Sequence, residues 1–274
     1  IWSDITGINF SETVNLAQIV IDDEESGAFT DSDFANGVTT SAFVNVDSAW
    51  LQLYGANVGS YTFQAYVHEI GHAIGLGHAG NYNNDATYPY DALYQNDSWA
   101  TSVMSYFSQT ESTYFADQGF NERHLVTPMV ADILAAQQLY GVSSTARSGS
   151  TTYGFNSNAG TLYDATVTTN VAFTIFDTGG TDTLDYSGYF FNQRIDLNPE
   201  AFSNIGGGVG NVSIARSTII ENAIGGDRAD VLIGNSVGNT LTGNAGNDQI
   251  NGNAGNDTVS GNDGNDTLTG GVGN

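Results

Sequence analysis

Three of the four histidines in the chain lie within one segment, HEIGHAIGLGH at residues 68–78. His68 and His72 are four positions apart, so on a helix both imidazoles leave the same face and can bind one metal ion. Gly75 allows the helix to end in a left-handed conformation, after which the chain can return His78 as a third nitrogen ligand. A fourth position open to water distinguishes a catalytic zinc site from a structural one. The spacing therefore predicts one catalytic Zn²⁺ ion.

Glu69 lies beside these ligands, where its carboxylate can reach a water on the metal rather than the metal itself. The alternative is a group of core histidines that bind nothing. The extended motif fixes three His, one Glu and one Gly, however, and its chance expectation in such a chain is on the order of 10⁻⁵. The pattern favours hydrolysis with Glu69 as general base. The chain has no cysteine, which excludes disulfides, Cys-based zinc sites and thiol nucleophiles.

A second motif, SVMSYF at residues 102–107, contains Met104 and Tyr106. Met104 alone would be interpreted as an ordinary core residue. After an extended zinc motif, a methionine turn beneath the metal is the hallmark of the metzincins. We therefore predict that Met104 lies under the zinc site.

The elements that position these motifs can be predicted from residue patterns. Strands are predicted at 17–22 and 41–46, where β-branched and aromatic residues are bounded by polar turn residues. Apolar residues at i, i+3 and i+4 spacing predict a helix over 61–75 that carries the zinc motif. A further helix is predicted over 127–141, with Thr127-Pro128 at its start and Gly141 at its end. A short apolar strand is predicted at 171–176, and a domain boundary near 141–150.

A nine-residue period runs from Gly225 to the end of the chain, as in GNAGNDTVS at 252–260. The eighth position is always aliphatic, and the sixth is Asp in four of five repeats. These two sets are Leu232, Leu241, Ile250, Val259 and Leu268, and Asp230, Asp248, Asp257 and Asp266, with Asn239 as the exception. A flexible Gly-rich linker would not keep this phase. The period predicts a calcium-binding parallel β-roll in which two repeats form one coil, so that turns 18 residues apart stack.

Acidic residues dominate the charge: the 274 residues include 30 Asp or Glu and 5 Lys or Arg, a formal net charge of −25 at pH 7. Such a chain cannot neutralise a row of phosphates, which excludes nucleic acid and anionic membrane surfaces as partners. No apolar run approaches the ~18 residues that a membrane span needs, which excludes membrane insertion. Asp outnumbers Glu by 22 to 8. This bias favours short, rigid oxygen ligands for a hard cation such as Ca²⁺.

Together these motifs resemble the serralysin-type metzincins (family M10B), secreted bacterial zinc endopeptidases with a C-terminal calcium-binding domain of RTX repeats. Further matching segments are LYG at 139–141, TYGFNSN at 152–158 and IENAIGG at 220–226. One departure is Ala79, where the family usually has Pro after the third His. The resemblance implies an α+β zincin-like (metzincin) catalytic domain at 1–141, followed by an all-β domain at 142–274 that combines a parallel β-roll and a β-sandwich. Both ends are expected to be incomplete.

The resemblance also implies roles for individual residues. Tyr106 would be a switchable fifth zinc ligand that leaves the metal on substrate binding and donates a hydrogen bond to the oxyanion. The strand at 41–46 would be the edge of the cleft and would hold substrate by main-chain pairing through Ala42, Phe43, Val44 and Asn45. Several structural Ca²⁺ ions would be bound by Arg147, Gly149, Thr151, Asp177, Gly179, Gly180, Asp182, Ile219, Glu221, Gly226, Arg228, Asp230, Asn235, Val237, Asn239, Gly243, Asn244, Ala245, Gly246, Asp248, Gly252, Ala254, Asp257, Gly261, Asp263 and Asp266.

The implied partners are protein and peptide substrates and proteinaceous protease inhibitors. The protein would be a monomer, secreted to the extracellular space by a bacterial type I route. Two other classes of function are open. An RTX adhesion or binding module with a vestigial zinc site would be expected to have lost Glu69 or Tyr106, and both are present. A pore-forming RTX toxin would need an amphipathic or apolar segment, which this chain lacks.

Overall fold

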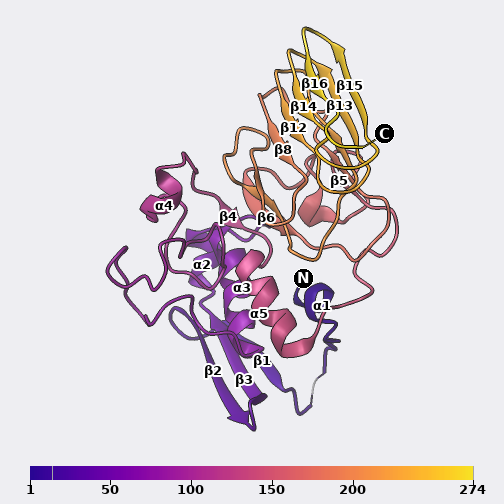
Figure 1. The fold of residues 1–274 in the computed structure, drawn as a ribbon. Coiled ribbons are helices and arrows are strands. Elements are labelled where there is room, and N and C mark those ends of the chain that lie inside the picture. Colours follow the sequence, from indigo (N-terminus) through magenta and orange to yellow (C-terminus); the bar gives the residue numbers. More distant parts are fainter. Residues whose placement is uncertain (14, 274) are drawn as a thin grey trace. The chain divides into compact units, whose positions relative to one another are not determined.

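The computed structural model describes residues 1–13 and 15–273, and the chain divides into two compact units (Figure 1). Unit 1 comprises Ile1–Gln118 and Glu122–Ser143, and unit 2 comprises Gly119–Asn121 and Ser144–Asn274. In the part of the chain that the structure describes, every helix is too short or too polar to span a membrane.

Unit 1 combines helices with one small sheet. Its elements are α1 (Trp2–Thr6), β1 (Ile19–Asp22), β2 (Ala28–Ala35), β3 (Val38–Val46), α2 (Ala49–Leu53), α3 (Tyr61–Ala73), α4 (Thr113–Ala116), β4 (His124–Leu125) and α5 (Val130–Tyr140). The strands predicted at 17–22 and 41–46 are confirmed as β1 and the second half of β3. Strand β2 was not predicted from the sequence.

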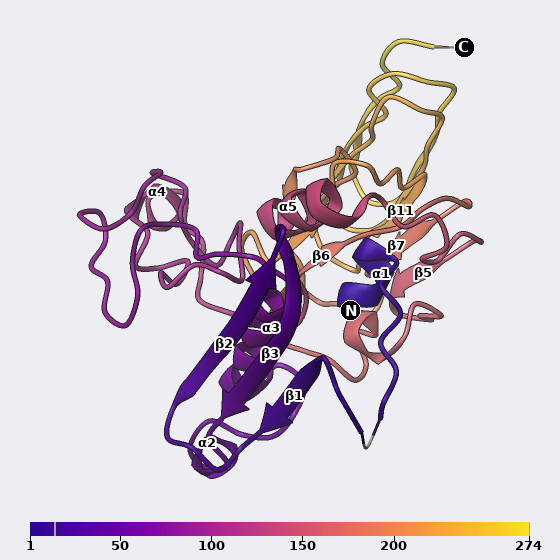
Figure 2. The ribbon, with the colours of Figure 1, turned by 90° about the horizontal axis from the view of Figure 1, so that it is seen from below.

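Strand β3 is the centre of a three-stranded sheet with the order β1-β3-β2 (Figure 2). It runs parallel to β1 and antiparallel to β2. The β2–β3 hairpin turns at Asn36-Gly37, where both residues have positive φ (55° and 78°), as a type I′ turn requires.

The prediction that the strand at 41–46 forms the edge of a cleft is therefore wrong. The main chain of Ala42, Phe43, Val44 and Asn45 pairs with Ile19–Asp22 on one side and with β2 on the other. Ala42, Val44 and Asn45 are also buried. The prediction failed because β2, which occupies this edge of the sheet, was not predicted, so the edge that the resemblance implies was assigned to the next strand.

Helix α3 lies against this sheet and carries the zinc motif, as predicted. Its N-cap is Ser60, whose hydroxyl accepts a hydrogen bond from the Phe63 N–H at 3.2 Å. Ala73 packs with Ala42 and Val44 of β3 in a buried apolar cluster. The helix ends at Ala73, two residues earlier than predicted, with Ile74 as its C-cap, and Gly75 follows with a φ of +97°, which confirms the predicted left-handed residue.

Helix α5 begins at Val130, two residues after Pro128, the predicted first helical residue, and ends before Gly141 (φ +84°) as predicted. The difference has a local cause. The Asp132 carboxylate accepts a hydrogen bond from the Met129 N–H at 2.8 Å and so caps the first turn, leaving Thr127-Pro128 outside the helix.

Unit 2 is built of short strands. Its elements are β5 (Thr152–Gly154), the 3₁₀ helix η1 (Thr161–Tyr163), β6 (Val171–Ile175), β7 (Thr183–Asp185), β8 (Arg194–Asp196), β9 (Phe202–Ser203), β10 (Val212–Ile214), β11 (Asn222–Ile224), β12 (Val231–Ile233), β13 (Thr240–Ala245), β14 (Gln249–Asn251), β15 (Thr258–Asp263) and β16 (Thr267–Thr269). The strand predicted at 171–176 is confirmed as β6, which pairs in parallel with β10.

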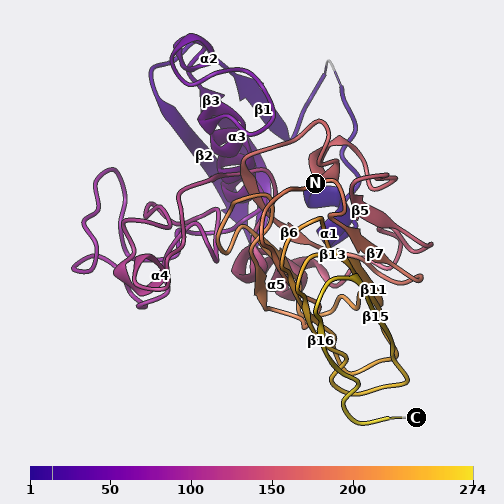
Figure 3. The same ribbon diagram turned by 90° about the horizontal axis from the view of Figure 1, so that it is seen from above.

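The repeats extend two parallel sheets, with the orders β15-β13-β11-β7-β5 (Figure 3) and β16-β14-β12-β8 (Figure 1), whose first strands lie ahead of the repeats. Successive strands alternate between the sheets, so each coil takes 18 residues, as Leu241 opposite Val259 and Leu232 opposite Ile250 show. Leu232, Leu241 and Ile250 are buried between the sheets, whereas Leu268 is 48% exposed. This arrangement agrees with the predicted β-roll.

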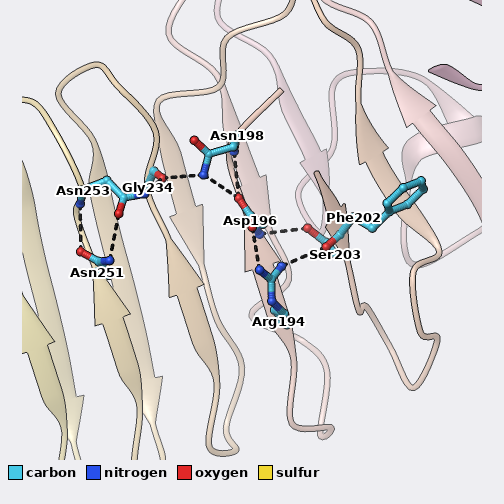
Figure 4. A network of polar contacts seen from close by, with 8 residues as sticks. All are labelled: Arg194, Asp196, Asn198, Phe202, Ser203, Gly234, Asn251 and Asn253. Atoms are coloured by element: carbon cyan, nitrogen blue, oxygen red, sulfur yellow. Dashed lines mark hydrogen bonds and ion pairs between the residues drawn. The ribbon is translucent and has the colours of Figure 1, made fainter. Parts of the chain in front are cut away.

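Asparagine side chains tie neighbouring coils together (Figure 4). The carbonyl of Gly234 accepts from Asn198 Nδ2 at 3.0 Å and from Asn253 Nδ2 at 2.6 Å. Asn244 Nδ2 donates to the Gly225 carbonyl at 2.8 Å in the same way. These bonds satisfy main-chain carbonyls at the turns, where the sheet ladder ends.

Candidate metal centre and active-site pocket

The imidazoles of His68, His72 and His78 converge on one point in unit 1. Nε2 of His72 lies 3.1 Å from Nε2 of His68 and 3.0 Å from Nε2 of His78. Among the residues described, these three form a group whose ligand atoms all lie within 4.8 Å of one another. The structure therefore brings together all three predicted zinc ligands.

The other ring nitrogen of each histidine fixes its tautomer. The Nδ1 atoms lie 2.7–2.8 Å from main-chain carbonyls, those of Val103 for His68, Leu76 for His72 and Tyr82 for His78. A carbonyl oxygen can only accept, so each Nδ1 carries the proton and each Nε2 presents a lone pair. Three lone pairs that face one another repel unless a cation lies among them. The donor set thus fits a metal ion with one position open.

Burial keeps these histidines in the neutral form that a metal requires. Burial, and then the neighbouring His72, lower the pKa of His68 to about 3. Burial also lowers the pKa of His72 and of His78, in each case against a hydrogen bond to a main-chain carbonyl. At neutral pH protons therefore do not compete with a metal for the Nε2 atoms.

A cavity of about 370 Å³ opens beside the histidines. Its walls include His68, Glu69, Tyr106, Ala28, Asn84, Asp85 and the aromatic residues Trp50, Tyr61 and Trp99. Glu69 and Tyr106, the two residues predicted to act in catalysis, therefore line the same cavity as His68, a predicted metal ligand.

Glu69 is 5% exposed, and burial raises its pKa to about 7. The hydroxyl of Thr30 in β2 opposes this shift, because it lies 2.8 Å from Glu69 Oε2. The same hydroxyl lies 2.9 Å from the main-chain carbonyl of Glu69. A buried carboxylate with a pKa near 7 is suited to general acid–base chemistry.

Tyr106 lies beside the histidines, with its ring centroid 4.5 Å from that of His78 and 6.1 Å from that of His68. Burial raises its pKa, and a backbone hydrogen bond from Asn84 opposes the shift. The phenol therefore keeps its proton at neutral pH and can donate a hydrogen bond into the cavity.

Met104 packs directly beneath the zinc motif. A Cβ added to Gly71 of α3 would lie 2.7 Å from Met104 Sδ and 3.1 Å from the Trp2 ring. The close approach thus depends on glycine at this position of the helix. Met104 is 2% exposed, so the turn at 102–107 packs against the helix that carries His68 and His72.

Asp132 holds this turn from helix α5, a role that the sequence analysis missed. Its carboxylate accepts from the Ser102 hydroxyl and from the Val103 N–H, both at 2.6 Å, as well as from Met129. The carbonyl of Val103 in turn accepts from His68. Burial raises the pKa of Asp132 to about 6 against these hydrogen bonds. The signal in the sequence was an Asp in the first turn of a helix, which predicts a cap but not its partners.

Strand β2 provides the free edge that β3 does not. Among the described residues, β2 pairs with β3 alone, and Ala28 at its start lines the cavity. The unpaired N–H and C=O groups of an edge strand are a template for an extended peptide.

The carboxylates at the sixth position of the repeats form two rows, as predicted. In one row, Asp248 Oδ1 accepts from the Asp230 N–H at 2.8 Å, and Asp266 Oδ1 accepts from the Asp248 N–H at 3.0 Å. In the other, Asp257 Oδ1 accepts from the Asn239 N–H at 2.8 Å. The buried Oδ2 atoms of Asp248 and Asp257 have no hydrogen-bond partner among the described residues. Such orphaned oxygens fit a cation between the coils.

The glycine that opens each repeat is explained by the same carboxylate. A Cβ on Gly243 would collide with the Asp248 carboxylate, and one on Gly252 with that of Asp257. The other predicted calcium residues of the repeats lie in turns or near the ends of strands: Gly226, Arg228, Asn235, Val237, Asn244, Ala245, Gly246, Ala254, Gly261 and Asp263.

A third carboxylate cluster lies ahead of the repeats. Asp182 Oδ1 accepts from the Thr151 N–H, and Glu221 Oε2 accepts from the Asp182 N–H, both at 2.7 Å. A Cβ on Gly180 would meet the Gly149 carbonyl. Burial, with the charges of Asp177 and Glu221, raises the pKa of Asp182 to about 6. Its Oδ2 is buried without a hydrogen-bond partner among the described residues.

Two of the predicted calcium residues here also make hydrogen bonds within the protein. The Asp177 carboxylate accepts from the Tyr153 hydroxyl at 2.7 Å and from the Gly179 N–H at 2.9 Å. The Arg147 guanidinium donates to the Phe176 carbonyl at 2.7 Å, and the resemblance implies that Arg147 binds calcium through its main-chain carbonyl, which this contact does not involve. Ile219 is 49% exposed.

Comparison with known proteins supports the family resemblance. A family model described as Peptidase M10 serralysin C terminal matches residues 142–270, and one described as Peptidase M66 matches residues 52–122. The chain is 40% identical over 248 residues to metallopeptidase AprA of Pseudomonas marginalis, covering 86% of this chain and 52% of that protein. It is 42% identical over 246 residues to serralysin C of Dickeya chrysanthemi, covering 85% and 50%. Serralysin of Photorhabdus luminescens is 40% identical over 247 residues, again covering 85% and 50%.

The resemblance to the serralysins is thus confirmed, and this chain is a relative of the serralysins over about 85% of its length. It spans about half the length of the relatives that it matches.

Proposed function

We propose that this chain is the zinc- and calcium-binding part of a secreted endopeptidase that hydrolyses peptide bonds in proteins. The observation that carries the proposal is the convergence of three Nε2 lone pairs beside a cavity that Glu69 and Tyr106 also line. Three neutral imidazoles with an open position are typical of catalytic zinc. Zinc held there would supply Lewis acidity and lower the pKa of water to about 7.

The side chains around the cavity divide the remaining chemistry. Glu69, buried and with a raised pKa, takes the proton from the attacking water and passes it to the nitrogen of the leaving amine. Tyr106, whose pKa is also raised, donates its phenolic hydrogen to the developing oxyanion. The substrate pairs its main chain with the free edge of β2, which suits an endopeptidase of broad sequence preference.

In this proposal residues 1–141 are a zincin-like catalytic domain, and residues 142–274 bind several structural Ca²⁺ ions. The orphaned carboxylate oxygens of Asp182, Asp248 and Asp257 support the calcium sites. The relatives named serralysin and metallopeptidase support the activity. Proteinaceous inhibitors are the further partners, and the protein acts as an extracellular monomer.

The alternative of an RTX binding module with a vestigial zinc site has less support. Decay of a disused centre would be expected to break the contacts that orient the ligands. Here each Nδ1 keeps a carbonyl partner at 2.7–2.8 Å.

Glu69→Gln tests the proposal. The variant should keep one zinc per chain, because the ligands are unchanged, and should lose about 10³-fold or more in peptide hydrolysis, because the base is gone. Zinc is measured by atomic emission and cleavage with a quenched fluorescent peptide. Glu12→Gln, at an exposed position, is the matched control. Near-parental turnover in zinc-loaded Glu69→Gln would refute the mechanism, and a parent protein without chelator-sensitive cleavage would refute the function.

A further inference from the structure

The hydroxyl of Thr30 touches Glu69 at two places. It lies 2.8 Å from the carboxylate oxygen Oε2 and 2.9 Å from the main-chain carbonyl oxygen of the same residue. Thr30 and Glu69 are 39 positions apart in the chain, on β2 and α3. One hydroxyl therefore bridges the two ends of a single glutamate and restrains the torsions between them.

Thr30 is itself firmly placed. It pairs with Val44 in the β2–β3 ladder, and Val44 is completely buried. A β-branched side chain in a strand has few χ1 options, so the backbone of β2 fixes the direction of the hydroxyl. The position of the strand thus sets the position of the Glu69 carboxylate.

We propose that Thr30 is a positioning residue that holds the Glu69 carboxylate in the orientation for proton transfer. The proposal rests on the proposed function. Because Thr30 holds Oε2, Oε1 is left to face the attacking water. When the proton from water arrives on Oε1, Oε2 becomes the carbonyl oxygen of the acid and still accepts from Thr30. The proton then moves from Oε1 to the leaving amine, and Thr30 keeps its own proton throughout.

The contact also connects the base with the strand that would hold the substrate. Thr30 lies two residues beyond Ala28, which lines the cavity, and β2 is the free edge of the sheet. Strand β2 would therefore position both the bound peptide and the Glu69 carboxylate that acts on its scissile bond. Geometry of this kind is worth about 10²-fold in rate per ångström of misplacement.

The test compares Thr30→Val, which keeps the shape and removes the hydroxyl, with Thr30→Ser, which keeps the hydroxyl. Thr40→Val is the control, because it removes a threonine hydroxyl of the same sheet that bonds to the Asp33 carbonyl instead. We expect Thr30→Val to lower kcat about 10- to 100-fold with KM nearly unchanged and one zinc retained. Thr30→Ser should recover most of kcat, and Thr40→Val should match the parent. Equal losses in the Val and Ser variants, an unchanged kcat in Thr30→Val, or an effect confined to KM would each overturn the proposal.

A second readout does not depend on turnover. In protein labelled with ¹³C at the glutamate carboxyl carbon, the Glu69 resonance is assigned by its loss in Glu69→Gln. Thr30→Val should shift this resonance, and Thr40→Val should leave it in place. If the parent shows no chelator-sensitive cleavage, the proposed function fails. An unmoved Glu69 resonance in Thr30→Val overturns the positioning role in either case.

Discussion

Replacing Asp132 with alanine should loosen the turn beneath the histidines. The Asp132 carboxylate is 3% exposed and accepts hydrogen bonds from the Ser102 hydroxyl and from the N–H groups of Val103 and Met129. In the alanine variant the hydroxyl can rotate toward another acceptor, but the two N–H groups are fixed by the backbone. Each then loses a charged acceptor inside the protein.

The magnitude follows from these two groups. A buried N–H left without a partner costs about 1–3 kcal/mol, so we expect the loss of both to lower the free energy of unfolding of unit 1 by about 2–6 kcal/mol. Because the Val103 carbonyl accepts from His68 Nδ1, the change should also weaken zinc binding, by about 10- to 100-fold.

Tryptophan fluorescence during urea unfolding isolates the effect, because Trp2, Trp50 and Trp99 all lie in unit 1. Zinc affinity is measured by competition with a chelator of known affinity. Asp117→Ala, at an exposed position, controls for the loss of one negative charge. A free energy of unfolding within about 0.5 kcal/mol of the parent, as is usual for surface substitutions, with unchanged zinc affinity would refute the reasoning.

Three further predictions concern the oxyanion donor and the roll. Tyr106→Phe should lower kcat about 10²- to 10³-fold and leave KM nearly unchanged, because the hydroxyl acts only near the transition state; an unchanged kcat in steady-state kinetics would show that Tyr106 is only a core residue. Calcium removal should disorder the chain from about residue 225 onward before the tryptophan fluorescence of unit 1 changes, since one aliphatic residue per repeat cannot offset the ordering entropy; full protection of the Leu241 and Ile250 amides from hydrogen exchange in EGTA would contradict this. Burial raises the pKa of Asp230 to about 6, above its ordinary value, so the folded state binds this proton more tightly than the unfolded state. Protons should therefore compete with Ca²⁺ for this carboxylate, and the calcium-loaded roll should lose stability as the pH falls from about 6 to about 4; a melting temperature that stays constant over this range would count against the assignment.

Features encoded by regular spacing could be predicted from the sequence. The nine-residue period specifies which residues stack, because a coil of two repeats places position i beside i+18, and the strand register follows it. The zinc motif could be predicted for the same reason, since helical spacing and one left-handed glycine bring three imidazoles together.

The failures concern features without a local pattern. Strand β2 alternates poorly and contains Asp31 and Asp33; its one local signal is the Asn36-Gly37 turn dipeptide, which the prediction did not take into account. Without β2, the next strand was mistaken for the edge of the sheet. The Thr30–Glu69 contact spans 39 positions and the Asp132–Ser102 contact 30, and each partner alone is an ordinary polar residue.

The close contact between Gly71 and Met104 constrains how the zinc motif can vary. The zinc motif does not specify residue 71, the third residue after the first histidine, because this residue is not a predicted metal ligand. Packing against Met104 nevertheless restricts which residues can occupy position 71. A methyl group at position 71 would require the Met104 side chain to shift or to be replaced by a smaller one, and it would also press on the Trp2 ring. The two positions, 33 residues apart in the chain, are therefore expected to be epistatic: alanine at position 71 should be tolerated better beside a smaller residue at position 104.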